Sequence, residues 1–122
     1  MLWGLSIIMK NKECTRYFSS KQEEYIANLL NCKRQCGSGS TPFAKGDVIA
    51  DNWLFECKTT TKPKTSFSIK KDWIDKNFIE RVEMGKPYSA IVYQYEEGGT
   101  NYFVLDETTF KKLYERFEDD LY

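Results

Sequence analysis

Two runs of strand-forming residues joined by a short polar turn place the strongest constraint on how this chain folds. The runs cover residues 47–50 and 53–58, and Asp51 and Asn52 lie between them. A two-residue polar turn between β-branched and aromatic runs predicts a β-hairpin. A hairpin alone is not stable in water, so further strands and helices must cover its faces.

The hairpin carries charge where a buried strand usually carries apolar residues. Because side chains alternate between the two faces of a strand, Glu56 and Lys58 share one face. Phe55 and Cys57 then point to the opposite face, where we expect apolar packing. Asp47 reaches the Glu56 side if the hairpin register allows it. Carboxylate and lysine pairs on strands also occur as plain cross-strand ion pairs, so both interpretations stay open.

The remaining chain predicts helices and strands that alternate with this hairpin. These elements cover residues 21–34 (helix), 70–84 (helix), 89–95 (strand), 101–105 (strand) and a last helix from 106 or 108. The order is helix-strand-strand-helix-strand-strand-helix, which predicts an α/β fold with a mixed β-sheet flanked by helices. At 122 residues the chain is long enough for a single domain. Residues 1–8 are interpreted as an extra strand or an N-terminal extension.

Local signals support the helices. Ser20 and Glu23 have the spacing of a capping box, which gives Glu23 a structural role as one alternative. Glu23 also precedes Ile26, Ala27 and Leu30 at helical spacing, which places it on the face turned toward the sheet. In the later helices, apolar residues recur with helical period at Trp73, Ile74, Phe78, Ile79 and Val82, and at Phe110, Leu113, Tyr114 and Phe117.

The composition excludes several classes of site. The chain contains no histidine, which removes Cys2His2 zinc sites, the HExxH motif, Ser-His-Asp triads and nucleases with a histidine base. No CxxC pair occurs among the cysteines, so we expect free thiols in a reducing cytoplasm rather than a metal site or disulfides. The cysteines are Cys14, Cys32, Cys36 and Cys57.

Charge is distributed unevenly although the formal net charge is zero. Residues 31–71 hold eight basic and three acidic side chains, whereas residues 72–122 hold six basic and twelve acidic ones. A polyanion would approach the first segment and be repelled by the second, although lysine-rich loops are often merely solvated. The opening MLWGLSIIMK lacks the flanks of a signal peptide and is too short to span a bilayer, so we expect no membrane association.

Asp47, Glu56 and Lys58 together form a chemically meaningful set. Two carboxylates held close together repel unless a cation or a bound proton offsets their charge. Carboxylate oxygens suit Mg²⁺ or Mn²⁺, which keep several waters and accept a phosphate oxygen. A nearby lysine orients or helps to deprotonate a water, or stabilises charge on phosphorus. These three side chains are the minimum set of functional groups for hydrolysing a phosphodiester without histidine.

The hairpin and the segment before it resemble the PD-(D/E)xK nuclease superfamily. Gly46-Asp47 matches the Pro-Asp half of that motif, with glycine in place of proline, and Glu56-Cys57-Lys58 matches the ExK half. Residues 34–40, RQCGSGS, are similar to the R-x-x-GSG segment of archaeal-type Holliday junction resolvases and their phage relatives. A helix with a glutamate near its start precedes it, as in that family.

The resemblance implies a restriction-endonuclease-like fold and a Mg²⁺-dependent endodeoxyribonuclease of DNA recombination, with Mn²⁺ as a substitute. Asp47, Glu56 and the Cys57 backbone carbonyl would bind the metal. Glu23 would act as an outer ligand, either through water or by fixing a second ion, and Lys58 would activate water or stabilise charge. Contacts to the DNA backbone would come from Arg34, Ser38, Ser40, Lys62, Lys64, Lys70 and Lys71.

A Holliday junction resolvase would make two symmetric cuts in a four-way junction, which implies a C2 homodimer. Aromatic residues left outside the core are candidates for its interface, namely Trp73, Tyr93, Tyr95, Tyr102 and Phe103. Two alternatives stay open: a less selective nicking or debranching nuclease of phage type, and a DNA-binding module without turnover. The GSGS turn is alternatively an ordinary flexible linker. A cytoplasmic location is expected, in the host cytoplasm if the chain is phage-encoded.

Overall fold

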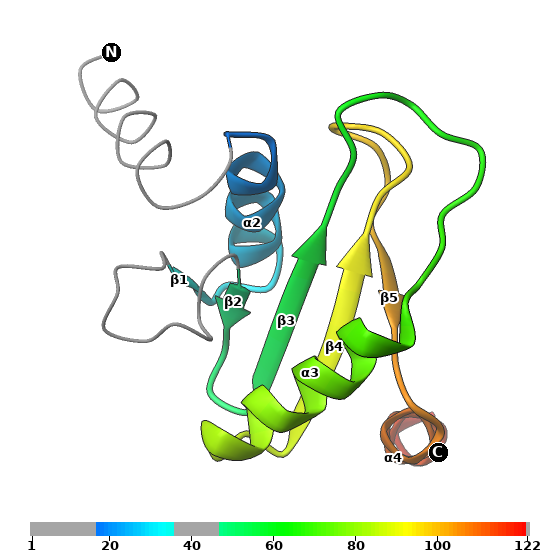
Figure 1. Cartoon of the computed structure of the whole chain (residues 1–122). Helices are drawn as coiled ribbons and strands as arrows, with labels where there is room; N and C mark the ends of the chain where they lie inside the picture. The colour runs from blue at the N-terminus through cyan, green and yellow to red at the C-terminus, as the bar shows by residue number, and fades with distance from the viewer. Residues whose placement is uncertain (1–16, 36–46, 122) are drawn as a thin grey trace.

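A mixed five-stranded sheet with helices on both faces forms the fold (Figure 1). The computed structural model describes residues 17–35 and 47–121. The elements, in chain order, are α2 (Tyr17–Leu29), β1 (Lys33–Gln35), β2 (Asp47–Ile49), β3 (Trp53–Lys58), α3 (Lys71–Glu83), β4 (Tyr88–Tyr93), β5 (Tyr102–Val104) and α4 (Glu107–Asp120). The predicted α/β class with a mixed sheet is confirmed, and β1 is a strand that the sequence did not predict.

The strands follow one another across the sheet in sequence order, from β1 to β5. The pairs β1–β2, β2–β3 and β4–β5 are antiparallel, whereas β3 and β4 run parallel. A parallel pair needs a long crossover connection, and residues 59–70 together with α3 supply it. Figure 1 shows α3 crossing in front of β3 and β4.

The predicted hairpin is present as β2 and β3. Asp47 lies opposite Glu56, and Val48 lies opposite Phe55. The backbone N–H of Ala50 donates to the Trp53 carbonyl at 2.9 Å, which closes the turn. The register that the sequence left open is therefore the one that places the two carboxylates side by side.

The core lies on the sheet face covered by α2. Its buried residues are Ile26 and Ala27 from the helix and Val48, Phe55, Cys57, Ala90 and Val92 from the strands. All five strand residues share one face because they alternate along each strand or pair directly across the ladder. The predicted apolar packing of Phe55 and Cys57 is confirmed.

The prediction for the first helix was wrong at both ends. The helix α2 already includes Tyr17–Leu29, so Ser20 lies inside it and the proposed capping box is not its start. Asn31 adopts φ +53° directly after the helix, a left-handed conformation that asparagine tolerates better than most residues. The chain then pairs with β2 as a strand, so residues 33 and 34 are not helical.

The apolar stripes of the last two helices are largely exposed and not buried against the sheet. In α3 the buried residues are Asn77 and Glu80, because the sheet face beneath this helix carries Glu56 and Lys58. In α4, Asp106 caps the first turn by accepting a hydrogen bond from the Thr109 N–H at 2.8 Å. The exposed apolar residues of the two helices are Ile74, Phe78, Ile79, Val82, Phe110, Leu113, Tyr114, Phe117 and Leu121. None of the helices in the described ranges is long and apolar enough to cross a membrane.

Candidate functional site

Asp47 and Glu56 meet on the sheet face that α3 crosses. They are direct cross-strand partners in β2 and β3, and they are only 1% and 8% exposed. Lys58 lies two residues further along β3, and its Nζ is 3.5 Å from Glu56 Oε1. The fold thus brings together the three residues that the sequence singled out.

Helix α3 adds a further carboxylate, Glu80, which sequence reasoning missed. Glu80 is only 5% exposed, and it lies seven residues after Trp73 and three after Asn77, on the helix stripe that faces the sheet. Burial and the charge of Glu56 raise the pKa of Glu80. The sequence signal that could have identified Glu80 is the polar stripe of α3, which lies on a different side of the helix from its apolar residues.

The carboxylates dominate the electrostatics of the site. Burial, followed by the charges of Glu80, Glu56 and Glu23, raises the pKa of Asp47 to about 9. Among the residues described, Asp47 Oδ2 and Glu56 Oε2 are buried without a hydrogen-bond partner. Buried carboxylates in such a group need a bound proton or a cation. Asp47 therefore carries a proton at neutral pH unless a cation replaces it.

A divalent cation fits the chemistry of this donor set. The unpartnered carboxylate oxygens are the ligand type that Mg²⁺ prefers. Within residues 17–35 and 47–121, no three Asp, Glu, Cys or His side chains are arranged to hold an ion by themselves. An ion bound by Asp47 and Glu56 would therefore take its other ligands from water, substrate phosphate or backbone, and Mg²⁺ commonly binds in this way.

Glu23 approaches this group from α2. It is fully buried, as its predicted inward position requires, whereas Glu24 is only partly buried. The Glu23 charge contributes to the raised pKa values of both Asp47 and the Cys57 thiol. Cys57 is a free, buried thiol, and Cys32 is also free. The metal-binding roles of Glu23 and of the Cys57 carbonyl stay predictions, and Cys14 and Cys36 lie outside the described residues.

Both the side chain and the backbone of Lys58 make close contacts. Its Nζ lies 4.6 Å from the centroid of the Trp73 ring, close enough for a cation–π interaction worth about 0.5–2 kcal/mol. Its backbone carbonyl accepts a hydrogen bond from Gln22 Nε2 at 2.9 Å. The ammonium group is therefore positioned between a carboxylate and an aromatic face.

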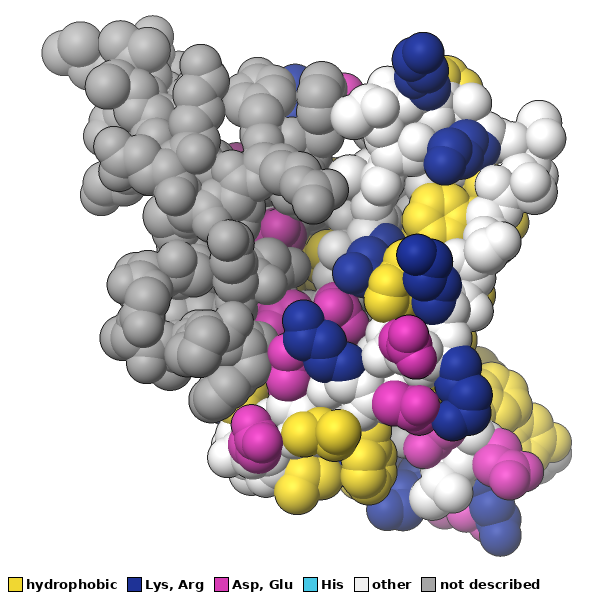
Figure 2. Space-filling model, in the orientation of Figure 1, with side chains coloured by type: hydrophobic (Ala, Val, Ile, Leu, Met, Phe, Trp, Pro, Cys, Tyr) yellow, Lys and Arg dark blue, Asp and Glu magenta, His cyan; other side chains and the backbone are white. Residues whose placement is uncertain are grey.

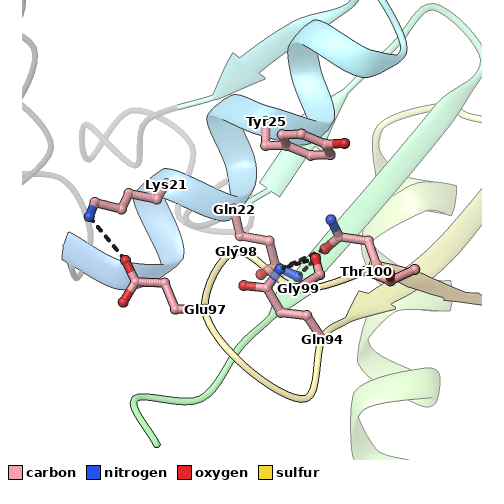
Figure 3. Close-up of a pocket in the computed structure, with 9 residues that line it drawn as sticks. Lys21, Gln22, Tyr25, Gln94, Glu97, Gly98, Gly99 and Thr100 are labelled. Atoms are coloured by element: carbon pink, nitrogen blue, oxygen red, sulfur yellow. Dashed lines mark hydrogen bonds and ion pairs between the residues drawn. The ribbon is translucent and has the colours of Figure 1, made fainter. Parts of the chain in front are cut away.

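Gln22 links α2 to the ends of the two central strands (Figure 3). Besides its bond to Lys58, its Nε2 lies 3.3 Å from the Val92 carbonyl and 3.1 Å from Asn101 Oδ1. Gln94 Nε2 donates to the same Asn101 oxygen at 3.2 Å. These amides border a cavity of about 310 Å³ between α2 and the turn at residues 97–100. Sequence reasoning missed Gln22, although it lies four residues before the buried Ile26 on the same helix face.

The residues predicted to bind DNA divide into three groups. Ser38 and Ser40, with Gly46 of the motif, lie outside the described residues. Arg34 pairs through its backbone with Val48 in the β1–β2 ladder. The four lysines are exposed and lie in or beside the crossover connection, namely Lys62, Lys64, Lys70 and Lys71.

The lysines of the crossover connection lie on the same face as the carboxylates, outside the Asp47–Glu56 pair. Figure 2 shows acidic side chains near the middle of this face, with basic and hydrophobic side chains interleaved toward the upper ends of β3 and β4. Lys70 Nζ lies 5.8 Å from the Trp73 ring centroid. Lys71 is engaged in an exposed ion pair with Asp75 at 3.0 Å, so it is less available to a ligand than its neighbours.

Comparisons with known proteins identified no relative of this chain. No protein-family model, no curated protein and no solved structure matches this chain. The interpretation of the site therefore depends on the sequence motif and on the arrangement of Asp47, Glu56, Lys58 and Glu80.

Proposed function

We propose that this protein is a Mg²⁺-dependent endodeoxyribonuclease of the PD-(D/E)xK type that cuts branched DNA, most closely a Holliday junction resolvase. The observation that carries the proposal is the cross-strand pairing of Asp47 with Glu56, with Lys58 3.5 Å from Glu56. An antiparallel hairpin followed by a parallel strand, reached through a helix, is compatible with the restriction-endonuclease-like fold that the motif implies.

Asp47 and Glu56 would hold the cation, with the Cys57 carbonyl as a further ligand. Bound Mg²⁺ supplies a lowered water pKa and neutralises charge on the phosphate. Asp47 gives up its proton when the cation binds. Lys58, held by Glu56 and Trp73, orients the attacking water or stabilises the charge that develops on phosphorus. Glu23 and Glu80 add negative charge at the periphery, and Glu23 acts as an outer ligand.

DNA would approach the face that carries the lysines of the crossover connection. Contacts from lysines to phosphates give affinity with little sequence preference. Lys62, Lys64 and Lys70 are suited to this role, with Arg34, Ser38 and Ser40 as the further contacts that the motif implies. The acidic C-terminal helix would keep the rest of the molecule away from the DNA.

A homodimer would supply the second active site that symmetric cleavage requires. We propose that the exposed apolar surface of α3 and α4 forms its interface. Eight large apolar side chains of these helices, and Leu121 directly after α4, are each more than a third exposed, which is typical of an interaction surface rather than of a solvated one. The groove between the helices, of about 130 Å³, is lined in part by Ile74, Phe78 and Leu105.

The deciding experiment is cleavage of a labelled four-way junction with Mg²⁺ or Mn²⁺. The parent should cut, whereas Asp47→Asn and Lys58→Ala should bind the junction without cutting it. Asp51→Asn, an exposed turn position in the same hairpin, is the matched control and should cut like the parent. No cleavage by the parent with either metal would overturn the proposal.

The same assay separates the remaining alternatives. Symmetric nicks in the junction with intact linear duplex identify a resolvase. Nicks in flaps and duplexes as well identify a less selective debranching nuclease. Binding without any cleavage identifies a DNA-binding module.

A further inference from the structure

Five aromatic side chains form a continuous cluster beside Lys58. The aromatic cluster consists of Phe67, Trp73, Tyr93, Tyr95 and Tyr102. Phe67 contacts three of the others, with centroids 4.9 Å from Tyr93, 6.1 Å from Trp73 and 6.5 Å from Tyr95. Tyr102 lies 5.9 Å from Tyr93 and 5.7 Å from Tyr95. The rings come from the crossover connection, α3, β4, β5 and the turn after β4.

The aromatic cluster is not part of the core. None of its members is buried, and Tyr102 is 47% exposed. The core cluster packed under α2 lies on the other face of the sheet. On the face that carries the rings, Leu54 and Ile91 are buried. Four of the rings are half-buried and Tyr102 is exposed, so the cluster presents an aromatic surface to solvent.

Lysines lie among these rings. Lys58 Nζ is 4.6 Å from the Trp73 centroid, and Lys64 Nζ is 6.0 Å from the Phe67 centroid. The N–H of Lys64 donates to the Tyr95 carbonyl at 2.9 Å, which fixes the crossover connection against the end of β4. Aromatic faces with lysines between them combine the two chemistries that bind unpaired nucleotides, namely stacking on bases and contact with phosphates.

We propose that the aromatic cluster binds single-stranded DNA, in the form of unpaired nucleotides that adjoin the cleavage site. Bases within a duplex are already stacked on their neighbours, so only unpaired bases gain from these rings. Lys58 pairs in register with Tyr93 of the cluster, so a nucleotide stacked here places its backbone near the carboxylates. This inference rests on the proposed nuclease function and specifies its substrate, a branch point with an unpaired segment.

A second copy of this chain suits the aromatic cluster less well. In a C2 dimer the same patch faces itself, so Lys58, Lys64 and Lys70 of one copy would meet the same lysines of the other. The apolar surface of α3 and α4 also has a cation beside it, since the Arg81 guanidinium lies 4.7 Å from the Phe78 ring centroid. The aromatic cluster has three lysines close to its rings, so α3 and α4 form the better interface. The charge on the cluster thus favours an anionic partner.

Binding of fluorescein-labelled oligothymidylate of about ten nucleotides, followed by anisotropy in EDTA, tests this proposal apart from cleavage. Tyr102→Leu and Phe67→Leu keep an apolar side chain but remove the ring, and each should weaken binding about tenfold. Tyr102→Phe and Phe67→Tyr keep the ring and should bind like the parent. Tyr25→Leu, at an exposed aromatic position on α2, is the matched control and should have no effect. Duplex of the same length should bind more weakly to the parent.

Equal binding by the parent and both leucine variants would overturn the proposal, as would equal affinity for single strand and duplex. A leucine variant that loses its oligomeric state in sedimentation, while binding the oligonucleotide normally, assigns the cluster to a second copy instead. The nuclease proposal fails separately: a parent that binds the oligonucleotide but never cuts retains this site and loses only the catalytic assignment.

Discussion

The ammonium group of Lys58 lies 4.6 Å from the centre of the Trp73 ring, and this contact joins β3 to the first turn of α3. It fixes the orientation of the basic side chain that lies beside Glu56. A second lysine, Lys76, lies 3.8 Å from the Glu80 carboxylate. In the proposed nuclease Trp73 would act through Lys58, as a positioning residue rather than a catalytic one.

Replacing Trp73 should therefore lower kcat at saturating substrate, and it should also weaken binding of unpaired nucleotides because its ring belongs to the aromatic cluster. Trp73→Leu removes the aromatic face and frees the lysine, and we expect about a tenfold fall in kcat with folding retained, in line with a cation–π contribution of about 1–2 kcal/mol. Trp73→Phe should recover part of the rate. Asp72→Asn, an exposed change in the same turn of α3, should cut like the parent. An unchanged kcat in Trp73→Leu would exclude the positioning role.

Stability should fall with rising pH in the absence of a divalent cation. The pKa of Asp47 is raised from its ordinary value of 3.8 to about 9 in the folded protein, so the folded state binds more protons there than the unfolded state. The contribution is fully present below pH 3.8 and is lost as the pH rises toward 9. In EDTA, the Tm of the parent should drop between pH 5 and pH 8.

Asp47→Asn should flatten this pH profile, and Asp51→Asn should reproduce that of the parent. A cation that favours the ionised carboxylate should act in the opposite direction. Added Mg²⁺ should therefore raise the Tm of the parent more at pH 8 than at pH 5, and should leave Asp47→Asn nearly unchanged. A parent profile that is flat in EDTA would argue against the buried, protonated Asp47.

Removing the Gln22 amide should destabilise the protein and also disturb the position of Lys58 in the candidate site. Gln22→Ala leaves the carbonyls of Lys58 and Val92 without their donor in a buried position, which costs about 1–3 kcal/mol in the free energy of unfolding. Asn28→Ala, an exposed change on the same helix, is the matched control for chemical denaturation. Equal stability of the two variants would show that water replaces the amide.

Charge placed on the apolar surface of α4 should dissociate the proposed dimer. Phe117→Glu is expected to shift sedimentation from dimer to monomer, because an isologous contact introduces the charge twice. Glu115→Gln on the same helix should leave the dimer intact. The monomeric variant should nick only one strand of a junction at a time. A parent that sediments as a monomer at every accessible concentration contradicts the proposed interface.

The parts of the fold that the sequence predicted are those set by neighbouring residues. The hairpin of Asp47 and Glu56 follows from strand propensity and a two-residue turn, and side-chain alternation then places Lys58 beside Glu56. The start of the last helix, predicted at residue 106 or 108, is equally local, and α4 begins at Glu107. The metal, DNA and dimer assignments stay predictions, because none of them follows from local structure.

The missed features depend on packing between distant segments. Strand β1 pairs with the edge of β2. The helix α2 therefore ends at Leu29, before residue 34 where its sequence pattern predicted the end. Glu80 and Trp73 belong to the site only because α3 turns its polar stripe to the charged side of the sheet and exposes Phe78 and its apolar neighbours. From its own sequence, α3 is expected to bury its apolar residues against the sheet and to expose its polar stripe.

The placement of both carboxylates on one hairpin also has a consequence for how the chain folds. Hairpins close within about 1–10 μs, well before distant segments assemble. Asp47 and Glu56 therefore meet at an early step, while water still screens their charges. Their repulsion grows when α2 and α3 dock and exclude that water, so a proton or a divalent ion eases the docking of the helices rather than the closure of the hairpin.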